Sequence, residues 1–188
     1  MVIYRLNANH DSYDACQVEY SIQGHSAFTN KRSFRFDGTS VKASWHPAKL
    51  TRYQELPLGD HISKLSSDVV ILRKSAVDKL KNILGNVELL PTVCDFGDYW
   101  MVNVLDILDC VDYEHSDYTT FSNNARLDGR TKIIAFDQIS FLPERVMGYH
   151  LFKTIDLPKS EIYVDNVFVK AVQDHGITGF LFQKVWEG

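Results

Sequence analysis

Short segments in which apolar and polar residues alternate dominate the first third of the chain. They cover residues 15–22, 33–36 and 41–45. A period of two is typical of half-buried antiparallel strands, because successive side chains point to opposite faces. Asp37-Gly38 follows the second segment directly and predicts a turn. The N-terminal region is therefore predicted to be rich in strands.

The middle of the chain predicts a buried strand followed by a helix. Residues 69–72 form a short apolar run, and apolar residues then recur at helical spacing over residues 76–84. Ser75 is placed to cap this helix, and Gly85 to end it in a left-handed conformation.

Several strands and one more helix are predicted in the second half. Residues 87–93 and 99–105 flank a turn and indicate a hairpin, and residues 132–136 form another apolar strand. Asp165 is placed to cap a helix that ends at His175-Gly176. Strands at residues 162–164 and 179–186 enclose this helix. The predicted class is α+β, with a mainly antiparallel sheet and a few short helices.

The chain length allows one large domain or two lobes with a common core. We expect a β-rich lobe over residues 1–60 and an α+β lobe over residues 61–188, joined in one compact unit, because no Pro/Gly-rich linker separates them. Residues 1–7 predict a first strand rather than a signal peptide. No apolar run reaches the roughly 18–20 residues that span a bilayer. The cytoplasm is the expected compartment.

Composition and motifs argue against several kinds of chemistry. A net charge of −4 speaks against general nucleic-acid binding, which needs clustered cations. Cys16, Cys94 and Cys110 each have apolar neighbours, which favours buried reduced thiols over a catalytic role. The seven histidines are scattered singly, without metal-binding spacing. We therefore predict no catalytic residue, no metal and no cofactor, and the protein is not expected to be an enzyme.

Charge is segregated along the chain. No Lys or Arg occurs between Lys81 and Arg126, whereas residues 31–52 contain six bases and one acid. The two segments could pair with each other or form ordinary solvated faces. Alternatively, the acidic segment binds a basic partner, and complementary charge speeds that association. The acidic interval holds eight acids: Glu88, Asp95, Asp98, Asp106, Asp109, Asp112, Glu114 and Asp117.

Aromatic residues lie among these acids, which suits a protein-binding surface. Aromatic residues in strands are more often part of the core, and we expect this for Trp100 in particular. The residues predicted to bind a partner are Asp109, Asp112, Tyr113, Glu114, Asp117 and Tyr118.

From Trp45 onward, the order of motifs resembles the eleventh-numbered immunity family of bacterial polymorphic toxin systems. The motifs include Trp45-His46-Pro47, Val87-Glu88-Leu89-Leu90-Pro91, Tyr99-Trp100-Met101-Val102-Asn103-Val104, Leu108 to Ser116, and Gly176-Ile177-Thr178-Gly179-Phe180. The resemblance implies a protein that binds and neutralises a cognate toxin effector domain, with no catalytic residues. It also favours Asp112, Glu114 and Ser116 as contact residues. A basic toxin, such as a nuclease, would suit the acidic segment.

Two other functions are left open. One is an enzyme whose active site is assembled from dispersed residues, which a bound metal, nucleotide or sugar in a deep pocket would indicate. The other is a structural protein that self-associates, for example as a homodimer, through its aromatic and acidic face.

Overall fold

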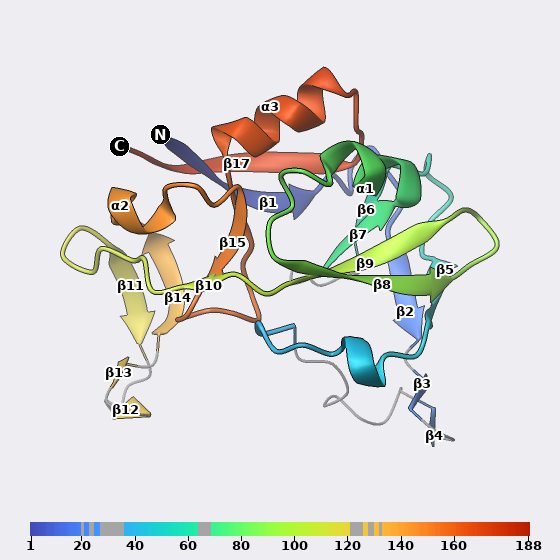
Figure 1. The fold of residues 1–188 in the computed structure, drawn as a ribbon, viewed down its shortest axis with the longest axis horizontal. Coiled ribbons are helices and arrows are strands. Elements are labelled where there is room, and N and C mark those ends of the chain that lie inside the picture. Colours follow the sequence, from blue (N-terminus) through green and yellow to red (C-terminus); the bar gives the residue numbers. More distant parts are fainter. Residues whose placement is uncertain are drawn as a thin grey trace.

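Two main β-sheets contribute to a common core in the computed structural model (Figure 1). The structure describes residues 1–19, 21–22, 25–26, 36–63, 69–120, 126–127, 130–131 and 133–188.

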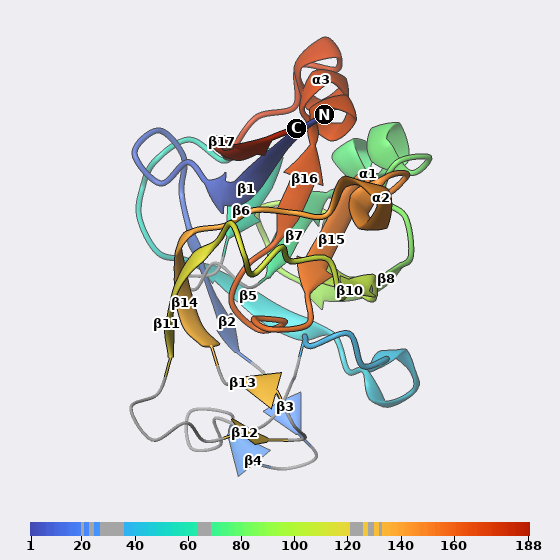
Figure 2. The same ribbon diagram turned by 90° about the vertical axis from the view of Figure 1, so that its left-hand side faces the viewer.

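The first sheet has five strands, and strand β1 (Val2–Ala8) lies within it between two strands from the end of the chain. Strand β1 pairs antiparallel with both β16 and β17, so the N- and C-terminal strands lie side by side (Figure 2). The order is β10 (Ile107–Leu108), β15 (Leu151–Thr154), β16 (Tyr163–Asp165), β1 and β17 (Phe180–Glu187).

The second sheet has six strands and likewise combines the beginning of the chain with its middle. Its β8–β9 hairpin is the one predicted at residues 87–105, so that prediction is confirmed. The order is β2 (Cys16–Glu19), β5 (Ala48–Arg52), β8 (Val87–Val93), β9 (Tyr99–Val104), β7 (Val70–Arg73) and β6 (His61–Ser63).

Three two-stranded sheets complete the described strands. They pair β11 (Asp117–Thr120) with β14 (Ile133–Gln138), β12 (Arg126–Leu127) with β13 (Arg130–Thr131), and β3 (Ser21–Ile22) with β4 (His25–Ser26). Among the described pairs, β5–β8 and β10–β15 are parallel and the others antiparallel. A mainly antiparallel arrangement with few helices is confirmed.

The helices are short, and the prediction for the last one is confirmed. In α3 (Asn166–Asp174), the Asp165 side chain accepts a hydrogen bond from the Phe168 amide at 2.9 Å. Gly176 follows with a positive φ of 59°. The other helices are η1 (Lys42–Ser44), α1 (Lys74–Leu80) and α2 (Pro143–Val146). No helix among the described residues is long and apolar enough to cross a membrane.

Two local predictions are wrong. Ser75 lies inside α1 and does not cap it, because the helix begins one residue earlier, at Lys74, whose amide donates to the Asp98 carbonyl at 2.8 Å. Residues 41–45 contain the 3₁₀ turn η1 and not a strand. In the predicted strand at residues 33–36, Phe36 is buried outside any strand, and the other three lie outside the described residues.

Three apolar clusters stabilise the fold. The largest packs α1 and α3 against strands of both main sheets, with Leu6, Leu72 and Phe168 among its members. A second joins β14, α2, β15 and β16 around Phe141. A third lies between β5, β8 and β9 and includes Cys16. The second cluster includes Cys110 and Val111, which lie near the start of the segment that contains the predicted binding residues.

Candidate functional site

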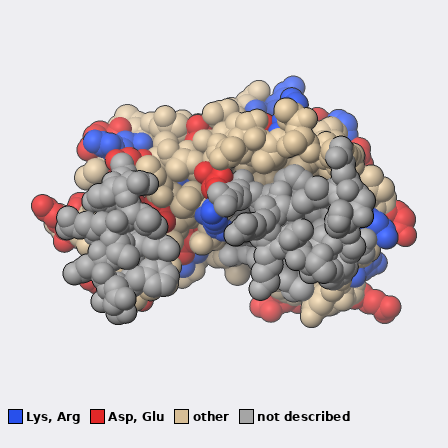
Figure 3. Space-filling model, turned by 90° about the horizontal axis from the view of Figure 1, so that it is seen from below, with Lys and Arg blue, Asp and Glu red and all other residues tan. Residues whose placement is uncertain are grey.

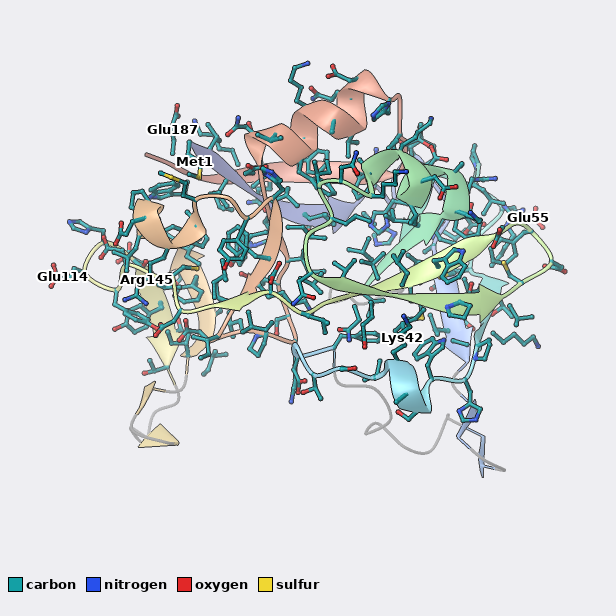
Figure 4. All side chains as sticks on the ribbon, in the orientation of Figure 1. Met1, Lys42, Glu55, Glu114, Arg145 and Glu187 are labelled. Atoms are coloured by element: carbon teal, nitrogen blue, oxygen red, sulfur yellow. The ribbon has the colours of Figure 1, made fainter. Side chains whose placement is uncertain are left out.

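The predicted partner-binding residues occupy one segment, residues 109–118, which connects β10 to β11 and is called the acidic loop below. It lies at the end of the molecule where Figure 4 labels Glu114, far from the β8–β9 hairpin. Strands β11 and β14 continue from it as a ribbon that runs away from α3 (Figures 1 and 2). Seen from below, acidic atoms project from this left-hand end (Figure 3).

The base of the acidic loop is held to the chain around residue 140 by backbone hydrogen bonds. Val111 forms an isolated β-bridge with Phe141. The Asp112 amide donates to the Ser140 carbonyl, and the Leu142 amide donates to the Cys110 carbonyl, both at 2.9 Å. Because Val111, Cys110 and Phe141 are buried in the same cluster, the loop is anchored in the core.

Two serine hydroxyls fix the turn from inside. The Ser116 hydroxyl donates to the Asp112 carbonyl at 2.6 Å and accepts from the Ser140 amide at 2.9 Å. The Ser140 hydroxyl donates to the His115 carbonyl at 2.7 Å. Ser116 is thus a structural residue of the loop, and its hydroxyl points toward the anchor.

Asp112 shapes the turn as well as adding charge. One carboxylate oxygen accepts from the Glu114 amide at 3.1 Å, and the other lies 2.7 Å from Nδ1 of His115. This hydrogen bond lowers the pKa of Asp112 and raises the pKa of His115 above its ordinary value. Protonation of His115 therefore offsets part of the negative charge of the loop.

Three acids of the loop point into solvent. The side chains of Asp109, Glu114 and Asp117 are exposed, whereas Asp112 is half-buried. Among the described residues, no cation forms an ion pair with Glu114 or Asp117. Exposure of these acids agrees with the sequence-based expectation, and their contact with a partner stays a prediction.

Tyr113 and Tyr118 form a small aromatic surface among these acids. They are 41% and 37% exposed, and their rings meet edge to face with centroids 6.1 Å apart. Tyr118 also contacts buried Phe136 at 6.1 Å, and the Tyr113 hydroxyl donates to Asp156 at 2.9 Å. Both rings are therefore held in place by these contacts and remain partly exposed.

Further exposed residues lie close to the acidic loop and were not predicted. Ile134 and Asp137 are exposed on β14, and the Thr119 hydroxyl of β11 lies 3.4 Å from the Asp137 carboxylate. Arg145 of α2 donates to the Asp109 carbonyl at 3.1 Å (Figure 4). A period of two would place Ile134 on the same face as buried Phe136, so it could not have marked Ile134 as exposed; the observed burial does not alternate, and the pairing with β11 has register shifts.

Not every acid of the interval from residue 82 to residue 125 belongs to this surface. Glu88 is only 8% exposed, and its carboxylate binds the Ser40 hydroxyl and the Val41 and Lys42 amides. Asp106 accepts from the Asn86 amide at 3.1 Å. Glu88 of the acidic interval therefore contacts the basic segment at residues 31–52, through two backbone amides and one hydroxyl.

The cysteines are free thiols in apolar surroundings. Cys16 and Cys110 are buried, and Cys94 is half-buried. Burial raises the pKa of the Cys110 thiol to about 12, and burial also raises the pKa of Cys94. Such thiols are poor nucleophiles, because the thiolate is the reactive form.

The anchored acidic loop and its exposed tyrosines are typical of a protein-binding surface. Residues 94–187 match the Immunity protein family (Imm11), and this stretch includes the entire acidic loop. The chain belongs to this family. A comparison with curated proteins finds no match.

Proposed function

We propose that this protein binds the effector domain of a cognate bacterial toxin and neutralises it by protein–protein interaction. Membership of the immunity protein family is the observation that carries this proposal. The family implies a cognate toxin as the partner. The proposal needs no cofactor and assigns no catalytic residue, and it places the protein in the cytoplasm of the cell that makes the toxin.

The acidic loop is the proposed contact surface. Its residues are Asp109, Asp112, Tyr113, Glu114, Asp117 and Tyr118. Tyrosines at the centre of an interface bury large apolar areas with little loss of side-chain freedom. Carboxylates around them favour a basic partner, such as a nuclease, and increase the rate of encounter.

The anchoring of the loop supports this proposal energetically. Binding is weakened when flexible groups must be ordered, at about 0.5–1.5 kcal/mol for each side chain that becomes fixed. The turn around Asp112 and Ser116 is already ordered by hydrogen bonds. The backbone of this turn therefore does not have to be ordered on binding, which lowers the entropy cost of association.

The experiment is co-expression with the toxin encoded by the adjacent reading frame. Cells that express the toxin alone should stop growing, and cells that also express this protein should grow and yield a complex that co-purifies. A truncated chain that lacks residues 94–187 serves as the negative control for protection. Equal killing with and without the full chain, or a neighbouring product that is harmless alone, would contradict the proposal.

A further inference from the structure

Ser140 supports the acidic loop from a position between two residues that are fixed in the core. Ile139 and Phe141 are both buried and belong to the same apolar cluster. The Phe141 ring also meets the rings of Tyr163 and Trp186 edge to face, with centroids 5.2 and 5.9 Å away. The backbone of Ser140 is therefore held by the core on both sides, and it gives the acidic loop a fixed point of attachment.

Ser140 is itself buried, and it forms hydrogen bonds with three positions of the acidic loop. Its carbonyl accepts from the Asp112 amide at 2.9 Å, and its amide donates to the Ser116 hydroxyl, also at 2.9 Å. Its hydroxyl donates to the His115 carbonyl at 2.7 Å. These bonds lie on both sides of residues 113–114, which are exposed in the proposed toxin-binding surface.

The hydroxyl is the part of Ser140 that depends on the type of amino acid. Any residue at this position supplies a backbone carbonyl, whereas alanine would remove the hydrogen bond to the His115 carbonyl. That bond sets the orientation of the peptide group that joins His115 to Ser116. At the other end of the turn, the Asp112 carboxylate lies 2.7 Å from Nδ1 of His115. The position of His115 relative to Asp112 therefore depends on the Ser140 hydroxyl.

We propose that Ser140 is a positioning residue for toxin binding, because its hydroxyl holds the turn that presents Tyr113 and Glu114. Ser140 acts through this turn, since it is buried and is not one of the contact residues proposed above. Without the hydroxyl, the turn adopts more conformations in the free chain, and ordering it on binding costs entropy. The inference rests on the proposed function, because the bound partner is the cognate toxin.

The kinetics of toxin binding distinguish positioning from charge. Electrostatic steering depends on the charges of the loop, which Ser140→Ala leaves unchanged, so the association rate constant and its salt dependence should change little. The dissociation rate constant should rise about fivefold, because a less ordered turn holds its contacts less well. Ser44→Ala is the matched control. It removes a similar hydrogen bond, from the exposed Ser44 to the Val41 carbonyl at 3.2 Å, and should leave both rate constants unchanged.

A second measurement needs no toxin, because His115 reports on the turn in the free chain. The hydrogen bond with Asp112 raises the pKa of His115 above its ordinary value, and the charge of Glu114 adds to this effect. Ser140→Ala should lower the pKa of His115 toward its ordinary value, because the imidazole is no longer held against Asp112. Ser44→Ala should leave this pKa unchanged. NMR titration of the folded chain measures it, and a general loss of stability would not shift it.

The two measurements together decide the role of Ser140. An unchanged dissociation rate in a folded Ser140→Ala chain overturns the proposal, whatever the pKa of His115. Faster dissociation with an unchanged pKa of His115 also overturns it, because Ser140 would then contact the toxin directly.

Two further outcomes need a separate reading. If Ser140→Ala does not fold, Ser116→Ala takes its place with the same expected results, because it breaks the same turn at the Asp112 carbonyl. If the wild-type chain does not bind the toxin at all, the proposed function itself fails. The titration of His115 in the free chain then still shows whether Ser140 holds the turn.

Discussion

His61 shows how one buried residue links the two main sheets. It is 2% exposed in β6, its Nδ1 lies 3.1 Å from the Ile71 carbonyl, and its ring stacks on Phe180 of β17 at 4.6 Å. A carbonyl can only accept, so Nδ1 carries the proton. Burial lowers the pKa of His61 to about 4, because the charged imidazolium is not solvated there.

This depressed pKa predicts a loss of stability in acid. Between pH 6.5 and pH 4, His61 is protonated in the unfolded chain and neutral in the folded chain. The stability of the folded chain is therefore full above pH 6.5 and falls as the pH drops toward 4. The loss approaches about 3 kcal/mol. Chemical denaturation at a series of pH values measures it. His61→Gln should flatten this dependence, whereas His46→Gln, at an exposed position, should not. An equally steep dependence in both variants would contradict the assignment.

At the scale of elements, Glu88 fastens residues 40–42 onto the β8–β9 hairpin. Its carboxylate accepts from the Val41 amide at 2.9 Å and from Asn103 at 3.0 Å. Burial alone would raise the pKa of Glu88, but hydrogen bonds from Ser40, Val41 and Asn103 outweigh it and hold the pKa below its ordinary value. Trp45 adds a second attachment, because its Nε1 donates to the Pro91 carbonyl at 2.8 Å.

Glu88→Gln should therefore weaken this attachment. We expect a loss of about 1–3 kcal/mol in the free energy of unfolding, because the partly buried amide bonds from Val41 and Lys42 lose a charged acceptor. Hydrogen exchange should accelerate at residues 41 and 42. Glu144→Gln, an exposed acid of α2, is the control and should change stability little. A Glu88→Gln chain as stable as wild type, with unchanged exchange, would show that the contact is dispensable.

The elements that the sequence predicts are those whose signals are local. The cap of α3 depends on Asp165 and Phe168, three residues apart, and the β8–β9 hairpin depends on adjacent strands. Ser75 fails as a cap because α1 begins one residue earlier, at Lys74, whose amide donates to the distant Asp98 carbonyl. Residues 41–45 do not form a strand, because the amides of Val41 and Lys42 donate to the Glu88 carboxylate, which lies more than forty positions away in the sequence. Contacts of that length leave no periodic pattern in the sequence.

At the scale of the whole molecule, the same distinction applies to the candidate site. Charge counting along the chain marks Glu114 and Asp117, and both side chains are exposed. It cannot reveal that Glu88 is buried. Nor can it reveal that the loop is anchored to Ser140 by hydrogen bonds between residues 24 and 25 positions apart.

The acidic loop is proposed to bind a basic surface of the cognate toxin. The suitable variant is the double reversal Glu114→Lys, Asp117→Lys, since both side chains are exposed. Asp112 is left intact because its carboxylate holds the turn. Asp78→Lys, Asp174→Lys on α1 and α3 changes the net charge equally at two other exposed positions and serves as the control.

The measurement is the association rate constant of the purified chain with the toxin at several salt concentrations. We expect the loop reversal to slow association about tenfold or more and to flatten its salt dependence, with an unfolding temperature close to that of wild type. The control reversal should keep most of the wild-type rate. If the loop reversal keeps the wild-type association rate, salt dependence and affinity, the acidic loop is not the toxin-binding surface.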